Sequence, residues 1–330
     1  DYAGTFDTNA VTLAPNGSDK IAGDNTTDGK IDQKGIAVTL VFIDSTQGWL
    51  VTDSGLQSEV PTATFLTATG GTITTSGNCK IHTFTGPGTF TVCSVSNCAS
   101  QNIVSHIVVA GGGGGGYDVG GGAGAGGFRE VKTPATPYTA SPLDGYPSAP
   151  NRVTVTATGF PIVVGAGGAG ATAVPSPAAA GSVSTFSTIT SAGGGIGGNY
   201  PGNNGGNGGS GGGGAGHCAG GNGGTGNTPP VSPAQGTNGG TAPSSGSPTA
   251  SSAGGGGATA AGAAGANPGS PYFTPRAAGA TTSINGSSVE YAQGGRGATD
   301  SAPCQQAGGN NTGTGGDGAG NAPGGICNAG

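Results

Sequence analysis

The side chains best suited to chemistry are few and stand apart from one another. Histidine occurs three times, at His82, His106 and His217. His82 and His106 lie in strand-like stretches, where a strand-surface or core position explains them. His217 has a reactive neighbour in Cys218, yet a metal site needs three or four converging ligands and a cysteine nucleophile needs a positioned base. Neither arrangement is visible, so we expect no metal site and no nucleophile here.

The carboxylates and the glycine runs also lack the spacing of known ligand sites. Asp19, Asp24, Asp28 and Asp32 could bind calcium in a loop, but they lack EF-hand spacing and are better explained as solvated turn residues. The glycine runs match phosphate-loop patterns by chance, because none ends in Gly-Lys-Ser/Thr or lies between a strand and a helix. No paired carboxylates stand in a recognisable glycosidase scaffold. We therefore predict that the protein is not an enzyme and uses no cofactor.

The six cysteines are even in number but scattered, which leaves fifteen possible pairings. Cys93 and Cys98 lie close enough in the chain to bridge a short loop, and Cys304 with Cys327 could staple the glycine-rich end. In an oxidising compartment such disulfides would compensate for a small apolar core. Six free thiols are the alternative.

Glycine follows a period of three between residues 199 and 227. One track carries glycine at every third position from Gly202 to Gly226, interrupted only by His217. A period of three is that of the extended left-handed helix, which has no internal hydrogen bonds. Because its peptide groups must pair with adjacent helices, we predict a packed bundle of polyglycine II-type helices. Proline is too sparse in the repeat for collagen, and a disordered glycine linker is the main alternative.

Strand-like segments dominate the first half of the chain, and no segment there has helical periodicity. β-branched residues bounded by Gly, Asn and Asp clusters indicate hairpins. We predict an all-β protein with little or no α-helix, in which short antiparallel β modules precede a glycine-rich bundle with long loops. The expected divisions are a small, oligomerising β module over 1–55, an antiparallel β domain over 56–110, and the glycine-rich domain over 111–330.

Composition and charge exclude several classes of partner. Only 7% of the residues are charged, and the net charge is −6, so the basic footprint of a nucleic-acid-binding protein is missing. No apolar run approaches the roughly 18 residues of a membrane helix, so we expect no membrane insertion. The sequence has no methionine and begins at Asp1 without a signal pattern. We expect a processed product or a piece of a longer chain.

Tyrosine is the one side chain whose placement indicates binding. Tyrosine offers a large amphipathic contact area at low entropic cost, as in binding loops. The alternative is that each ring caps the end of the bundle. The candidates in or beside glycine- and proline-rich loops are Tyr117, Tyr138, Tyr146, Tyr200, Tyr272 and Tyr291.

Several motifs in succession resemble the glycine-rich domain of tailed-bacteriophage tail fibres and related virion adhesins. They are HTFTGPGTFTV at 82–92, IVVAGGGGGG at 107–116, GGGAGAGGFRE at 120–130 and IVVGAGGAG at 162–170. Residues 10–52 are similar to a short β module that recurs in such proteins. The six cysteines are not part of this pattern.

The resemblance implies a structural or adhesive virion component, often trimeric, in which polyglycine helices carry loops to the host surface. We expect an extracellular location on the virion tail or exterior, a homo-oligomer with a trimer favoured, contacts with other virion proteins, and a bacterial receptor that is a polysaccharide or an outer-membrane protein. The alternatives are a non-adhesive virion element, such as a capsid decoration or fibre shaft, and a cellular glycine-rich filament.

Overall fold

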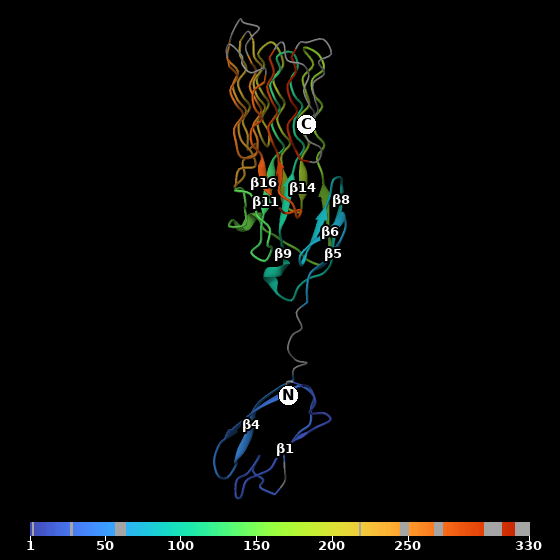
Figure 1. Ribbon diagram of the computed structural model, residues 1–330, viewed down its shortest axis with the longest axis vertical. Helices are drawn as coiled ribbons and strands as arrows, with labels where there is room; N and C mark the ends of the chain where they lie inside the picture. Colours follow the sequence, from blue (N-terminus) through green and yellow to red (C-terminus); the bar gives the residue numbers. More distant parts are fainter. Residues whose placement is uncertain are drawn as a thin grey trace. The chain divides into compact units, whose positions relative to one another are not determined.

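The computed structural model of the chain (Figure 1) describes residues 1, 3–26, 29–56, 64–217, 219–244, 251–266, 273–299 and 312–320. It divides into two compact units, Asp1–Thr64 and Phe65–Gly330. Both units are built from short antiparallel strands, and the described helical residues form only short 3-10 turns. The all-β prediction is therefore confirmed.

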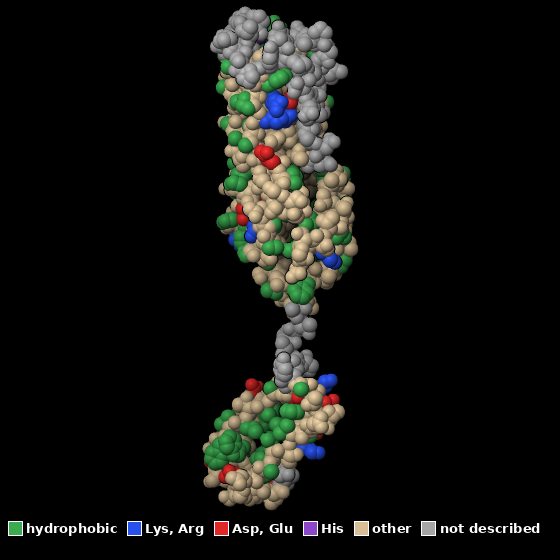
Figure 2. All heavy atoms as spheres, in the orientation of Figure 1, with side chains coloured by type: hydrophobic (Ala, Val, Ile, Leu, Met, Phe, Trp, Pro, Cys, Tyr) green, Lys and Arg blue, Asp and Glu red, His purple; other side chains and the backbone are tan. Residues whose placement is uncertain are grey.

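The N-terminal unit consists of two small sheets. Strand β1 (Val11–Leu13) pairs with β2 (Gly29–Ile31), and β3 (Ile36–Phe42) pairs with β4 (Trp49–Leu56) around a bulge at Thr39/Leu40. None of the apolar side chains described in this unit is buried. Several are strongly exposed on β3, β4 and their connection, and Figure 2 shows apolar side chains gathered on the visible face of the unit. A module of two-stranded sheets without a core is marginally stable by itself.

The second unit contains the remaining strands. The two short 3-10 helices are η2 (Ala99–Asn102) and η3 (Ala149–Asn151). The strands are β5 (Thr67–Thr69), β6 (Thr72–Ser76), β7 (Cys79–Thr83), β8 (Gly88–Ser94), β9 (Ile103–Val104), β10 (His106–Val109), β11 (Phe128–Val131), β12 (Val153–Thr154), β13 (Gly159–Val163), β14 (Ser184–Phe186), β15 (Ile189–Ser191), β16 (Ala280–Thr282) and β17 (Val289–Tyr291).

A five-stranded sheet in the order β15-β14-β13-β8-β5 supports the apolar core of this unit. The rings of Phe90 and Phe186 meet edge to face at 6.1 Å, and Val92, Val108 and Ile189 are buried in the same cluster. The other strands of this unit form the two-stranded pairs β6-β7, β10-β11, β9-β12 and β16-β17. The sheet takes strands from before and after the first glycine run, so the β-strands and the glycine segments form one unit.

The glycine segments form a bundle that is held together by backbone hydrogen bonds (Figure 1). Along residues 121–126, successive N–H groups donate to three neighbouring segments, 192–198, 251–257 and 312–319, and return to the first neighbour after three residues. Gly121 and Gly124, for example, both donate to that first neighbour, at 2.8 and 2.9 Å. This three-residue rotation between partners is the polyglycine II arrangement expected from the repeat.

Segment 120–127 lies at the centre of the bundle. Besides donating to three segments, its carbonyl groups accept from three others, within 113–116, 210–213 and 295–298. Its side chains are almost entirely enclosed, and Ala123 and Ala125 have no exposed surface. Buried peptide groups need partners, and here six surrounding segments supply them without a conventional side-chain core.

Close approach of the segments explains why glycine is required. A Cβ at Gly124 would overlap the carbonyl oxygen of Ser210, and a Cβ at Gly113 would overlap that of Gly195. Charged side chains are few over the visible side of the bundle in Figure 2. The repeated glycines are therefore required for close packing of the segments and do not form a flexible linker.

The bundle has two different ends. At the strand end, β10 precedes residue 111 and β11 follows residue 127. At the other end, which we call the turn end, segments reverse direction through 117–119, 172–177 and 199–202, and again at His217. His217 adopts a φ of 68°, so the single break in the glycine phase is a reversal between two antiparallel segments.

Candidate binding surface at the turn end of the bundle

Asn199 ties three reversals of the chain together at the turn end. Its side chain is only 4% exposed. The Oδ1 atom accepts from the Tyr117 N–H at 2.9 Å, and Nδ2 donates to the Ser176 carbonyl at 2.6 Å. The Tyr200 N–H in turn donates to the Tyr117 carbonyl at 3.2 Å. A single amide thus fixes the relative positions of turns that are far apart in sequence.

Aromatic side chains gather on this framework. The rings of Tyr200 and His217 lie 5.5 Å apart with a 50° tilt, and both residues are half-buried, as is Tyr117. Val174, in the adjacent turn, is exposed. Aromatic rings on a hydrogen-bonded backbone lose little entropy when they bind, so these residues are the candidates for a contact surface.

The turn 117–119 also contains backbone strain. Asp118 and Val119 adopt φ values of 56° and 53°. A left-handed conformation is a genuine outlier for a β-branched residue. Val119 is held there by burial and by its carbonyl, which accepts from the Gly216 N–H and from the Ser252 hydroxyl. Strain that the surroundings enforce is typical of sites with a function.

The other described tyrosine candidates lie at the strand end and have packing roles. The Tyr138 hydroxyl donates to the Val131 carbonyl at 3.3 Å, and burial, followed by the nearby Glu130 charge, raises the Tyr138 pKa. The Tyr146 ring lies 4.4 Å from the Arg152 guanidinium. Tyr291 packs 6.4 Å from Phe128, and burial raises its pKa. Tyr272 lies outside the described residues.

The cysteines near the five-stranded sheet are free. Cys93 lies in β8 with its thiol near the Thr91 carbonyl, whereas Cys98 precedes η2 with its thiol 3.2 Å from the Ser100 hydroxyl. The structure therefore does not join Cys93 to Cys98, because the two side chains point to different local partners. A hydrogen bond from Ser100 lowers the Cys98 pKa. Cys218, Cys304 and Cys327 lie outside the described residues.

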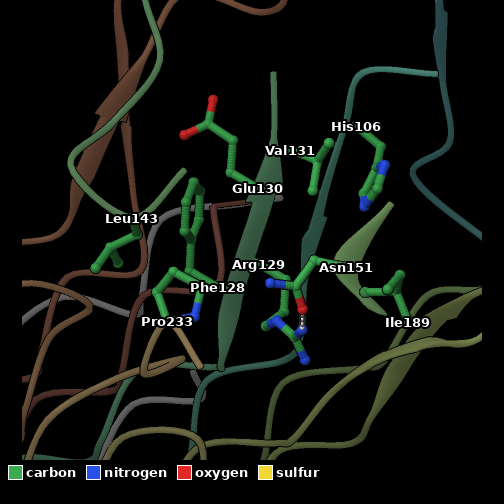
Figure 3. A pocket seen from close by; sticks show the side chains of 9 residues that line it. All are labelled: His106, Phe128, Arg129, Glu130, Val131, Leu143, Asn151, Ile189 and Pro233. Carbon is green, nitrogen blue, oxygen red and sulfur yellow. Dashed lines mark hydrogen bonds between the residues drawn. The ribbon is translucent and has the colours of Figure 1, made fainter. Parts of the chain in front are cut away.

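A hollow at the strand end is too tight to admit a water molecule (Figure 3). Phe128 and Glu130 lie on one side of β11, whereas Arg129 lies on the other, where it donates to the Asn151 Oδ1 at 2.6 Å. Glu130 accepts from the Thr282 hydroxyl at 2.6 Å and the Ser141 N–H at 2.8 Å. These groups are mutually satisfied and brace the strand end.

His106 lines the same hollow with its Nε2 atom buried and without a hydrogen-bond partner. Burial lowers its pKa to about 4. His82, in contrast, pairs Nδ1 with the Gly70 carbonyl at 2.8 Å. Among the residues that the structure describes, no three His, Cys, Asp or Glu side chains gather as a metal site would require, and none of the described helices could span a membrane.

Sequence reasoning missed Asn199 as the organising residue of the turn end. The signal was present, because Asn-Tyr-Pro-Gly follows a glycine run directly and such residues favour turns. The 82-residue separation from Tyr117 gave no local indication of the contact.

The fold and the site together define a class of protein, in which a bundle of polyglycine II-type segments adjoins a small β structure and ends in hydrogen-bonded turns. The chain belongs to the family described as the glycine-rich domain, whose model matches residues 83–330. Comparisons with curated proteins and with solved structures found no match.

Proposed function

We propose that the protein is a structural virion protein of a tailed phage, a tail fibre or receptor-binding adhesin that attaches to the bacterial host surface. The observation that carries the proposal is the turn end, where Tyr117 is bonded both to the Asn199 side chain and to the Tyr200 N–H, and where a strained Val119 lies in the same turn. The succession of motifs that resembles phage glycine-rich domains supports the same assignment.

The proposal gives the two ends of the bundle separate tasks. The strand end carries the apolar core and the braced polar groups around Glu130, so it maintains the fold. The turn end carries half-buried aromatic rings, which are the side chains most often responsible for recognition. Exposed turns on a rigid scaffold are where binding residues concentrate in proteins.

A non-adhesive virion element is the second candidate. The observation that favours it is the exposed apolar hairpin of the N-terminal unit, which suits assembly into a larger particle without requiring a receptor. This candidate predicts tight incorporation into particles and no binding to cells.

Competition for host cells tests the proposal. Purified chain should reduce phage adsorption, and a Tyr117→Ser/Tyr200→Ser variant should lose most of that effect. Tyr146→Ser is the matched control, because it removes the same kind of side chain at the strand end. Folded protein that neither binds cells nor competes would contradict the adhesin and favour the second candidate. Labelling of particles with antibody under the electron microscope then places the chain on tail or capsid.

A further inference from the structure

Three neighbouring glycine segments, 203–209, 219–226 and 236–242, form one outer layer of the bundle. The Gly205 N–H donates to the Asn222 carbonyl at 2.9 Å, and the Gly239 N–H donates to the Gly224 carbonyl at 3.0 Å. For other N–H groups of the layer, none of the described segments supplies a backbone carbonyl. These groups would be unpaired if the layer carried only glycine.

Asparagine side chains supply the missing acceptors. The Oδ1 atoms of Asn204 and Asn207 accept from the N–H groups of Asn222 and Thr225, at 2.8 and 2.7 Å. The Oδ1 atom of Asn238 accepts from the Gly226 N–H at 2.9 Å. The polar third position of the glycine repeat thus has a structural role, in which an amide carbonyl replaces a neighbouring helix.

The same hydrogen bonds fix the orientation of the amides. With Oδ1 engaged by the backbone, Nδ2 of each capping asparagine keeps two N–H donors, and no protein partner for them occurs among the described residues. All three asparagines are exposed, as are Asn222 and Thr225. Asn204 and Asn207 are three residues apart, which is about 9 Å along an extended helix of this type. These two asparagines therefore place donors at a regular spacing along one segment, and Asn238 adds donors on another segment of the layer.

The layer is also free of charge and of large apolar groups. No Asp, Glu, Lys or Arg occurs between Arg152 and Arg276. An anionic polymer would find no cation there, and a protein partner would find none of the aromatic or arginine side chains that anchor protein interfaces. A row of neutral donors suits an extended, uncharged polymer that is rich in oxygen acceptors.

We propose that this layer, which we call the asparagine face, binds an extended neutral polysaccharide, with the Nδ2 groups of Asn204, Asn207 and Asn238 donating to its hydroxyl and ring oxygens. The biological role of such binding, contact with glycans of the host surface, rests on the proposed adhesin function. The binding itself does not depend on that function and lies on the side of the bundle, apart from the turn end.

Replacing these asparagines by aspartate separates ligand binding from folding. In N204D/N207D/N238D each side chain keeps an acceptor oxygen for the backbone N–H but loses its outward donors. The matched control is N9D/N16D/N78D, which adds the same three charges at exposed asparagines elsewhere. Circular dichroism and thermal unfolding check that both variants fold.

Binding is measured with the full chain by affinity electrophoresis in gels that contain dextran, galactomannan or a neutral bacterial O-polysaccharide, with alginate as the acidic comparison. We expect at least one neutral polymer to retard the wild-type chain. Binding by N204D/N207D/N238D should be about tenfold weaker, and binding by the control variant should not change. The single variants N204D and N207D, which each remove the outward donors of one capping asparagine, should weaken binding several-fold and serve as the test if the triple variant does not fold.

Absence of binding to every neutral polymer would overturn the proposal, as would unchanged binding by the variants or a preference for alginate. A rise in molecular mass that the variants abolish would instead identify the face as a contact between copies. The adhesin proposal fails separately, when wild-type chain binds polysaccharide in the gel but neither binds cells nor competes for them.

Discussion

The Tyr117 N–H donates to Asn199 Oδ1 at 2.9 Å, which joins two turns that are 82 residues apart in the chain. The opposite side of the same amide binds the Ser176 carbonyl. One buried side chain therefore connects three reversals of the bundle, and the aromatic surface at the turn end depends on it.

Asn199→Ala should destabilise the protein by about 1 to 3 kcal/mol, because it removes two hydrogen bonds of a buried amide, to the Tyr117 N–H and to the Ser176 carbonyl. Asn203→Ala is the control, since that side chain is exposed in the same turn. Denaturant unfolding measures the difference, and amide exchange should accelerate at Tyr117 in the first variant alone. Equal stability of the two variants would show that Asn199 does not organise the turns.

Gly124→Ala should cost about 3 kcal/mol or more, because the new Cβ would overlap the Ser210 carbonyl oxygen at the centre of the bundle. Gly86→Ala meets no atom within 4 Å and serves as the matched control. Melting temperatures of the two variants are the readout. If both melt like the wild-type chain, the close packing of the central segment is wrong.

His106 should make the protein sensitive to mild acid. The folded-state pKa is about 4 because of burial, whereas an unfolded histidine titrates near 6.5. Between these values the unfolded chain binds more protons, so the free energy of unfolding falls by about 3 kcal/mol as the pH drops from about 6.5 to 4 and is unaffected by this group above that window. The nearby Arg129 charge acts in the same direction as burial, and the Asp144 charge and the bond to Val104 oppose it.

Denaturant titrations at pH 7 and pH 4.5 check this dependence. The wild-type chain should lose more stability than His106→Gln, which carries no titratable group. His82→Gln is the matched control, because it makes the same substitution at a histidine that does not line the hollow and leaves His106 in place. If the free energy of unfolding of His106→Gln falls with pH as much as that of the wild-type chain, the acid sensitivity belongs to other groups.

The Arg276–Asp317 ion pair should hold segment 312–320 in the bundle. Arg276 Nη2 lies 2.8 Å from Asp317 Oδ2, and the Arg296 N–H donates to Oδ1 at 2.8 Å. Burial raises the Asp317 pKa while the Arg276 charge opposes that shift. Arg276→Ala leaves a buried carboxylate without its counter-ion, so we expect a loss of about 3 kcal/mol.

Arg276→Ala/Asp317→Ala should be more stable than Arg276→Ala alone, because the unpaired charge is gone. Hydrogen exchange should show the largest increase in 312–320 for the single variant. If the losses of unfolding free energy in Arg276→Ala and in Asp317→Ala add up to the loss in the double variant, the two residues are not coupled.

The hairpin β3-β4 should mediate association between copies of the chain. Phe42 and Trp49 pair across it at 5.6 Å and are 47% and 41% exposed, in a unit with no buried apolar side chain among those described. Sedimentation should detect an oligomer, and Phe42→Ser/Trp49→Ser should shift it toward monomer. Val163→Ser, an exposed valine of the other unit, is the control. A wild-type chain that sediments as a monomer at every concentration would contradict the prediction.

The local sequence pattern was sufficient to predict the β-hairpins and the glycine bundle of this protein. Alternation of β-branched residues with Gly, Asn and Asp indicated the hairpins, because strand pairing over short loops depends on neighbouring residues. The three-residue glycine phase indicated a polyglycine II bundle, because only a backbone without Cβ atoms permits segments such as 120–127 to pack against six others. The scarcity of histidine and of charged residues predicts that the protein is not an enzyme, and this stays a prediction.

The tertiary structure alone decided which residues meet. Tyr117 and Tyr200 share the turn end while Tyr146 lies at the strand end, although all three follow similar glycine- and proline-rich sequence. Asn207 caps an N–H of a segment 18 residues away, and Asn199 joins turns much farther apart. Such contacts depend on the order in which segments enter the bundle, and nearly identical glycine repeats carry no information about that order.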